Sequence, residues 1–332
     1  MVVASLALLY SAGIYCPTLA EQVMTKGDGT INLEGLAINN GCWGNQVGTC
    51  GFANDEVRLE LDYQFGHSLI SQRLYKSLQT ACDWPVPTPK DWQPSEACTA
   101  AVQEAHSQQG PGKWDNANTY NFCTIEGQVP ASAMSDQQRM LKHGATEATL
   151  NEEGRQRWEL RKAQAPAPGA ETTGPLGYQQ IWCGGSDAYK VWSALPEVQA
   201  AWHVKPHDAS GAMKYTRAPA GDLRPLYKTL ASKYRMMIYS GDADGCVPHT
   251  GTEEWTAELG YPITEDWRPW LTDAHGGNSS AGAVTVGYTV QFGGGSKDFR
   301  FATVMGSGHE VPSFKPIPAY AAVRRFQEGK PL

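Results

Sequence analysis

The sequence predicts an α/β fold in which buried, mostly parallel strands alternate with helices. Apolar runs at 236–240, 284–292 and 299–304 have the length of strands, and the first and last end in Gly-rich loops. Stretches with helical spacing lie between such runs. With 332 residues, 41% of them apolar, the chain can bury a sizeable core.

The N-terminal part starts with an apolar stretch from Val2 to Tyr15, which we expect to be a buried strand running into a turn. It has no basic segment before it and no clear cleavage site after it, so it does not read as a signal peptide. Residues 31–38 form a second buried strand, which Asn39-Asn40-Gly41 stops as a turn. Residues 58–82 carry helical spacing.

The middle of the chain is polar and bears four of the eight cysteines. Residues 136–163 and 189–204 are expected to be helical, and the Pro/Ala/Gly-rich stretch 162–177 is expected to be a flexible tether. We therefore predict that residues 58–204 are a domain inserted into the sheet domain.

The sheet domain is expected to consist of residues 1–57 and 205–332. It closes with an amphipathic helix over 314–328, where Tyr320, Val323 and Phe326 share one face.

Charge and composition exclude several partners. The net charge is −7 and there is no Lys/Arg cluster, so we expect no nucleic-acid partner. No apolar run reaches the length of a membrane span. Gly293-Gly294-Gly295 opens no βαβ unit, and Pro206 opposes a helix that would pair His203 with His207 on a metal. Neither a cofactor nor a metal is expected, and oligomeric state is left open.

The eight cysteines form no CxxC motif and are even in number. This pattern suits disulfide bonds in an oxidising compartment, although buried thiols in a cytosolic protein are the alternative. Cys42 and Cys50 are separated by seven residues that include two glycines, so they can close a local loop. Asn278 begins a glycosylation sequon, which adds support for secretion.

Two candidate catalytic residues each follow a predicted strand. Asp244 and His309 lie in Gly-rich loops, where a sheet of this class places its ligands. A buried carboxylate can orient an imidazole there, and the order Asp then His is that of α/β-hydrolases. The alternative is that Asp244 caps a turn and His309 is an ordinary loop histidine.

The nucleophile is harder to find. A full G-x-S-x-G occurs nowhere, and Ser11-Ala12-Gly13 keeps only the end of that motif. Leu9 stands where the first glycine belongs, so Ser11 is a weak candidate beside the alternative of a serine that starts a helix.

Two segments carry a resemblance to a known family. Residues 238–248 (IYSGDADGCVP) resemble the catalytic-aspartate segment of serine carboxypeptidases, and residues 301–312 (FATVMGSGHEVP) resemble their catalytic-histidine segment. Residues 286–288 and 31–41 are similar to strands of the family. His67 to Ser71 and Tyr120 to Cys123 are similar to landmarks of its inserted cap, so the resemblance spans nearly the whole chain.

The resemblance implies an α/β-hydrolase fold with a disulfide-bearing helical cap. Asp244 would be the triad carboxylate and His309 the general base. The nucleophile position falls on Tyr10, with Ser11 one place late, and the Asn-Gly-Gly-Pro-Gly oxyanion segment of the family is absent. We therefore expect that the N-terminal third of the family's chain, with its strands, is missing, and that this chain as written is inactive.

The resemblance also implies pairings and an activity. Cys82 would pair with Cys98 and Cys123 with Cys183, leaving Cys16 and Cys246 as thiols. The implied function is a serine-type carboxypeptidase, which hydrolyses the last bond of peptides with a free C-terminus, in a vacuolar, lysosomal or extracellular compartment of the secretory pathway. A non-catalytic fragment or binding relative, and an acyltransferase on the same fold, are the alternatives.

Overall fold

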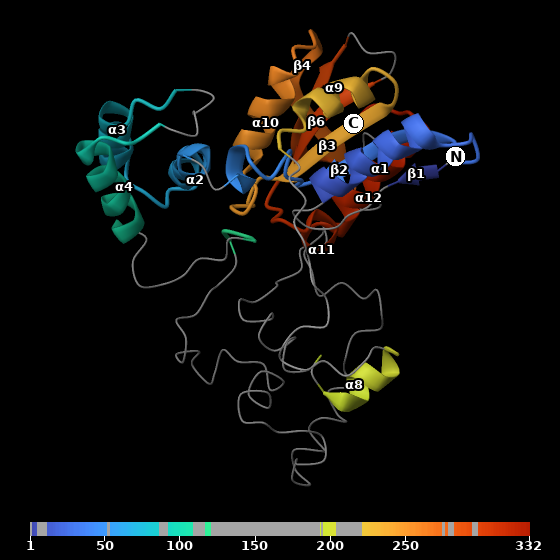
Figure 1. Ribbon diagram of the computed structural model, residues 1–332, viewed down its shortest axis with the longest axis horizontal. Helices are drawn as coiled ribbons and strands as arrows, with labels where there is room; N and C mark the ends of the chain where they lie inside the picture. Colours follow the sequence, from blue (N-terminus) through green and yellow to red (C-terminus); the bar gives the residue numbers. More distant parts are fainter. Residues whose placement is uncertain are drawn as a thin grey trace.

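The computed structural model, drawn as a ribbon in Figure 1, describes residues 2–4, 12–51, 54–85, 92–108, 117–120, 193, 195–203, 221–273, 276–277, 282–293 and 298–332. The strands are β1 (Val2–Ala4), β2 (Leu33–Asn39), β3 (Arg235–Gly241), β4 (Ile263–Thr272), β5 (Val284–Phe292) and β6 (Phe299–Val304). The helices are α1 (Ala12–Lys26), the 3₁₀ turn η1 (Gly48–Cys50), α2 (Asn54–Gly66), α3 (Gln72–Ala81), α4 (Glu96–Gln108), α8 (Pro196–Ala201), α9 (Arg224–Ala231), α10 (His249–Glu258), α11 (Val311–Phe314) and α12 (Pro316–Glu328).

The strands form one sheet in the order β1-β2-β3-β6-β5-β4. The pairs from β1 to β6 are parallel, whereas β5 is antiparallel to both of its neighbours. Every residue of β6 and nearly all of β3 is buried, as expected of parallel strands whose two faces are both covered. The predicted α/β fold with a largely parallel central sheet is confirmed.

Helices cover both faces of the sheet (Figure 1). On one face α1, α9 and α10 contribute Cys16, Tyr227 and Trp255 to the larger apolar core. On the other face α11 and α12 pack Val311 and Phe326 against the strands. We call this unit, the sheet with α1 and α9–α12, the sheet body.

Helices α2, α3 and α4 form a second unit, which we call the helical lobe, at one end of the sheet body (Figure 1). Its own apolar cluster includes Leu61, Leu74 and Leu78, and the Cys82–Cys98 disulfide bond joins the end of α3 to α4. Residues 121–192, which hold the tether 162–177, lie outside the described residues. The division into 1–57 with 205–332 and an inserted 58–204 therefore stays a prediction.

Two predictions are corrected, one of a strand and one of a helix. The stretch from Val2 to Tyr15 is strand only over β1 in the described part, and α1 already begins at Ala12. The spacing over 58–82 belongs to two helices, because Ser68 adopts a φ of 61° and the Ser71 hydroxyl accepts from the Leu74 N–H at 3.3 Å, which starts α3.

Strand β4 was not expected. It is an edge strand and is exposed along most of its length, so its sequence lacks a buried apolar run. The expected helix over 189–204 is seen as α8 at 196–201, and the closing helix begins at Pro316 rather than 314.

Candidate active site

Asp244 and His309 come together at one edge of the sheet. Their loops follow β3 and β6, which are parallel neighbours, so both loops emerge on the same side. His309 Nδ1 lies 2.8 Å from Asp244 Oδ2. Asp244 is fully buried and His309 is 4% exposed. The contact that the sequence predicted, between residues 65 positions apart, is present.

Three donors surround the Asp244 carboxylate. The Cys246 N–H donates to Oδ1 at 2.8 Å, while the Asn40 amide and His309 Nδ1 both donate to Oδ2. These hydrogen bonds offset the cost of burying a carboxylate. A carboxylate oxygen that is ionised can only accept, so Nδ1 of His309 carries the proton and Nε2 is left as the acceptor.

The two loops interlock through their backbones. A Cβ on Gly241 would lie 2.2 Å from the Ser307 carbonyl oxygen, a distance that only glycine permits. The Ala243 N–H donates to the same Ser307 carbonyl at 2.9 Å. Asp242 Oδ1 accepts from the Gly306 N–H at 2.6 Å. The relative position of the two loops is therefore set mainly by contacts to the main chain.

Asp242 also lies in a charged environment of its own. Burial raises the pKa of the Asp242 carboxyl, and the Gly306 N–H and the positive charges of His67 and Lys315 oppose that rise. Burial lowers the pKa of Lys315, with Asp242 opposing the effect. Asp242 thus ties the β3 loop to the loop of His309.

Sequence reasoning missed Asn39 and Asn40 as site residues, because it treated them only as a turn. Both are buried at the carboxyl end of β2. Asn40 contacts Asp244, and Asn39 donates to the His309 carbonyl at 3.3 Å. The signal that could have found them is their place: amides at the end of a buried strand, at the sheet edge that holds the other loops.

A short segment from beyond the helical lobe crosses the two loops. The His309 N–H donates to the Ala117 carbonyl at 2.7 Å, and the Thr119 N–H donates to the Ala243 carbonyl at 2.9 Å. A hydroxyl–hydroxyl hydrogen bond then joins Thr119 to Tyr63 of α2. The lobe is therefore connected to both candidate catalytic loops through residues 117–119.

Two histidines extend this region. The ring centroids of His67 and His249 are 6.4 Å apart, and His67 Nδ1 lies 2.9 Å from the Tyr63 carbonyl oxygen. Burial lowers the pKa of His249 to about 4, and the neighbouring His67 adds to the effect. His249 therefore stays neutral at mildly acidic pH.

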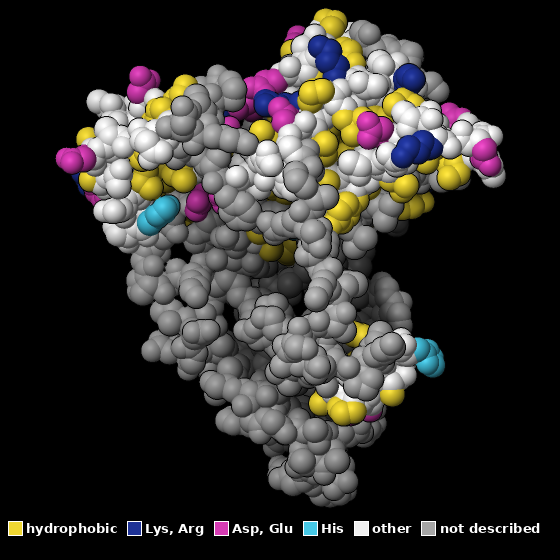
Figure 2. Space-filling model, viewed as in Figure 1, with side chains coloured by type: hydrophobic (Ala, Val, Ile, Leu, Met, Phe, Trp, Pro, Cys, Tyr) yellow, Lys and Arg dark blue, Asp and Glu magenta, His cyan; other side chains and the backbone are white. Residues whose placement is uncertain are grey.

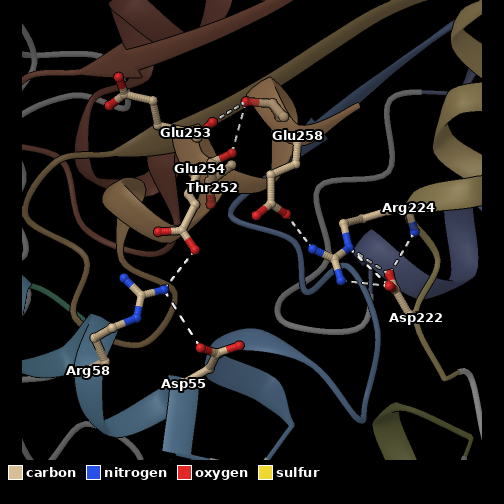
Figure 3. Close-up of polar contacts among 9 residues, drawn as sticks. Asp55, Arg58, Asp222, Arg224, Thr252, Glu253, Glu254 and Glu258 are labelled. Atoms are coloured by element: carbon tan, nitrogen blue, oxygen red, sulfur yellow. Dashed lines mark hydrogen bonds and ion pairs between the residues drawn. The ribbon is translucent and has the colours of Figure 1, made fainter. Parts of the chain in front are cut away.

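Helix α10, which begins soon after Asp244, is anchored by ion pairs that Figure 3 shows. Arg58 of α2 lies 2.7 Å from Glu254, and Asp55 lies 3.7 Å from the same guanidinium. Arg224 bridges Asp222, at 2.7 Å, and Glu258. In Figure 2 acidic and basic side chains gather at the boundary between the helical lobe and the sheet body.

The remaining predicted sites divide into two groups. The disulfide bonds Cys42–Cys50 and Cys82–Cys98 are present, and Cys16 and Cys246 are thiols. The other predicted residues lie outside the described part: Leu9, Tyr10, Ser11, Cys123, Cys183, His207 and Asn278. Within the described ranges, no helix is long and apolar enough to cross a membrane, and no three His, Cys, Asp or Glu side chains are grouped to hold a metal.

The profile of the family described as serine carboxypeptidase matches residues 10–329. The chain belongs to the serine carboxypeptidase family. Serine carboxypeptidase 1 of Hordeum vulgare is 29% identical over 97% of this chain and 62% of its own length. Serine carboxypeptidase 24 of Arabidopsis thaliana is 29% identical over 97% and 60%.

A carboxypeptidase-like relative and one solved structure also match the chain. Serine carboxypeptidase-like 20 of Arabidopsis thaliana is 26% identical over 97% of this chain and 62% of its own length. The crystal structure of Kex1, a prohormone-processing carboxypeptidase from Saccharomyces cerevisiae, matches with a TM-score of 0.51 at 14% identity, over 96% of this chain and 60% of that one. The chain thus spans about three fifths of the length of these proteins.

Proposed function

We propose that the protein has the reaction class of a serine-type carboxypeptidase, which hydrolyses the last peptide bond of substrates with a free C-terminus, and that turnover requires a serine at the nucleophile position, which this chain does not convincingly supply. The observation that carries this proposal is the buried hydrogen bond between Asp244 and His309. Membership of the family supports the reaction class. The disulfide bonds Cys42–Cys50 and Cys82–Cys98 support a compartment of the secretory pathway, vacuolar, lysosomal or extracellular.

The proposal gives each group a role. With its Nδ1 proton held by Asp244, His309 can accept a serine hydroxyl proton at Nε2 while the serine oxygen attacks the carbonyl carbon. The same proton then goes to the leaving amine as the C–N bond breaks. A water molecule then attacks the acyl-enzyme: His309 accepts its proton and returns it to the serine oxygen as the acyl group leaves. Asp244 stabilises the imidazolium that forms in each of the two half-reactions.

The nucleophile decides whether this chain reacts. By the resemblance its position falls on Tyr10, and Ser11 is one residue later, about 100° further around a helix. A tyrosine ring at that position would occupy the space that the substrate carbonyl needs. We expect that the chain as written does not turn over peptides.

A fluorophosphonate probe, which phosphonylates activated serines, tests these assignments. The unchanged chain is expected to remain unlabelled, whereas Tyr10→Ser is expected to react. Adding His309→Gln or Asp244→Asn to Tyr10→Ser should remove most of that labelling. Labelling of the unchanged chain that disappears in Ser11→Ala would show that Ser11 is the nucleophile and that the alignment is one residue off.

The products separate the remaining alternatives. Tyr10→Ser is incubated with a blocked dipeptide, with and without an alcohol acceptor, and the proposal expects the free C-terminal amino acid in both cases. An ester formed only with the acceptor would favour acyl transfer. Absence of labelling and turnover, with retained peptide binding, would favour a binding relative.

A further inference from the structure

Asn40 has an unusual position in the fold. It follows directly on β2, is fully buried and adopts a φ of 40°, in the left-handed region that few residues other than glycine enter. Its amide nitrogen donates to Asp244 Oδ2, and its amide oxygen accepts from the Gly241 N–H at 3.1 Å. One side chain therefore contacts both the end of β3 and the carboxylate in the loop that follows it.

Asn39 serves the other loop. Its amide nitrogen donates to the His309 carbonyl at 3.3 Å, and its amide oxygen accepts from the Val311 N–H at 3.2 Å. Its amide nitrogen also donates to the amide oxygen of Asn40. Two adjacent side chains of one strand end thus reach the aspartate loop and the histidine loop and are joined to each other.

Backbone conformation alone does not explain Asn40. Asparagine tolerates the left-handed region, but glycine adopts it more readily. What glycine lacks is the amide, whose two ends here meet two buried partners. The carboxylate oxygen that accepts from Asn40 is also the one that accepts from His309, so the amide restricts rotation of the group that aligns the imidazole.

We propose that Asn40 is a positioning residue of the active site, which holds the Asp244 carboxylate in line with His309, and that Asn39 fixes the backbone of the His309 loop. The inference rests on the proposed function, because it assigns a supporting role for that pair. The experiment that tests it measures the hydrogen bond between His309 and Asp244 rather than turnover. It can therefore be done whether or not the chain is active.

The experiment is NMR of the full chain labelled with ¹⁵N-histidine. The low-field Nδ1 proton of His309, identified by its loss in His309→Gln, reports the bond to Asp244. In Asn40→Gly, which keeps the left-handed turn but removes the amide, the resonance is expected to be lost while circular dichroism stays unchanged. Asn39→Ala, which removes the side-chain contacts to the backbone of the histidine loop, is expected to shift the resonance, and an unshifted resonance there would overturn the role of Asn39. The exposed control Asn32→Ala is expected to leave the resonance unchanged.

The outcomes separate the positioning role of Asn40 from the proposed function. An unchanged resonance in Asn40→Gly overturns the positioning role and leaves the proposed function standing. A resonance missing from the unchanged chain overturns both. If Asn40→Gly does not fold, Asn40→Ala carries the test, because alanine removes both ends of the amide without placing a second charge beside the Asp244 carboxylate. Loss of the resonance there supports the role, and retention overturns it.

Discussion

Two neighbouring junctions of this molecule are held in different ways. Between the loops of Asp244 and His309, the contacts are buried hydrogen bonds and backbone atoms in van der Waals contact. Between α2 and α10, the contacts include ion pairs that stay partly exposed, such as Arg58 with Glu254 (Figure 3). The first junction fixes the relative position of two reactive groups, and the second fixes a helix beside them.

The difference shows which contacts fix the positions of the side chains in this site. Main-chain contacts cannot rearrange without moving the strands, so they hold two side chains to a narrow range of distances. Ion pairs between long side chains can re-form after small shifts, since Arg58 also has Asp55 and Asp62 within 3.7 Å and 3.6 Å. The first junction should therefore be the more sensitive to substitution.

The largest effect is expected from Gly241→Ala. The added methyl group would meet the Ser307 and Gly308 carbonyl oxygens at 2.2 and 2.3 Å, and neither can move alone because both belong to the His309 loop. We expect a loss of about 3 kcal/mol of unfolding free energy, the upper part of the range for overpacking. Denaturant unfolding with matched m-values measures it.

Gly66→Ala is the matched control for that prediction. Gly66 ends α2, and a Cβ there would meet no atom within 4 Å. Alanine should stabilise the helix by about 0.5–1 kcal/mol. If Gly241→Ala were as harmless as Gly66→Ala, the two loops would not be held by their backbone contacts.

An effect of intermediate size on stability is expected from the titration of His249 with pH. Burial lowers the pKa of His249 in the folded protein to about 4, below its ordinary value of about 6.5. As pH falls from about 6.5 to about 4, the unfolded chain binds a proton that the folded chain does not, so stability decreases over this interval. The upper limit of the loss is about 3 kcal/mol.

The measurement compares the unchanged chain with His249→Leu across that pH range. The buried Asp242 has a raised pKa and acts in the opposite direction, since it favours the folded state as pH falls. The difference between the two proteins isolates His249: the unfolding free energy of the unchanged chain minus that of His249→Leu should decrease as pH falls from about 6.5 to about 4. Parallel curves would show that His249 does not titrate differently on folding.

The same contrast explains what the sequence could predict. Strands β3 and β6 are buried on both faces, so their apolar runs and the Gly-rich loops after them were visible in the sequence. Asp244 and His309 followed from those loops, since parallel strands bring their carboxyl ends together. Their burial and contact are consequences of the parallel pairing itself.

Features that depend on tertiary partners were not visible. Edge strand β4 is paired on one side only, so its sequence carries charges and Pro269 in place of an apolar pattern. The roles of Asn39 and Asn40 depend on which loops lie beside β2, which the local sequence does not state. Arg58 and Glu254, 196 residues apart, meet only because α2 packs on α10.

The smallest effect is expected from Glu254→Gln, which removes the charge of the closest partner of Arg58 and keeps its size. The Glu254 side chain is 34% exposed, so solvent screens the pair, and Asp55 and Asp62 still compensate the guanidinium. We expect a loss of about 1 kcal/mol at low salt that shrinks at high salt.

The Nδ1 resonance of His309 should be unaffected by Glu254→Gln, because the loops of Asp244 and His309 are held by other contacts. Glu328→Gln, at an ion pair on the surface of α12, is the control and should leave stability unchanged. A loss in Glu254→Gln that equals the loss in Gly241→Ala, or that does not respond to salt, would contradict the comparison. The α2–α10 junction would then be held by packing and hydrogen bonding, as the junction between the loops of Asp244 and His309 is. Its ion pairs would contribute little to stability.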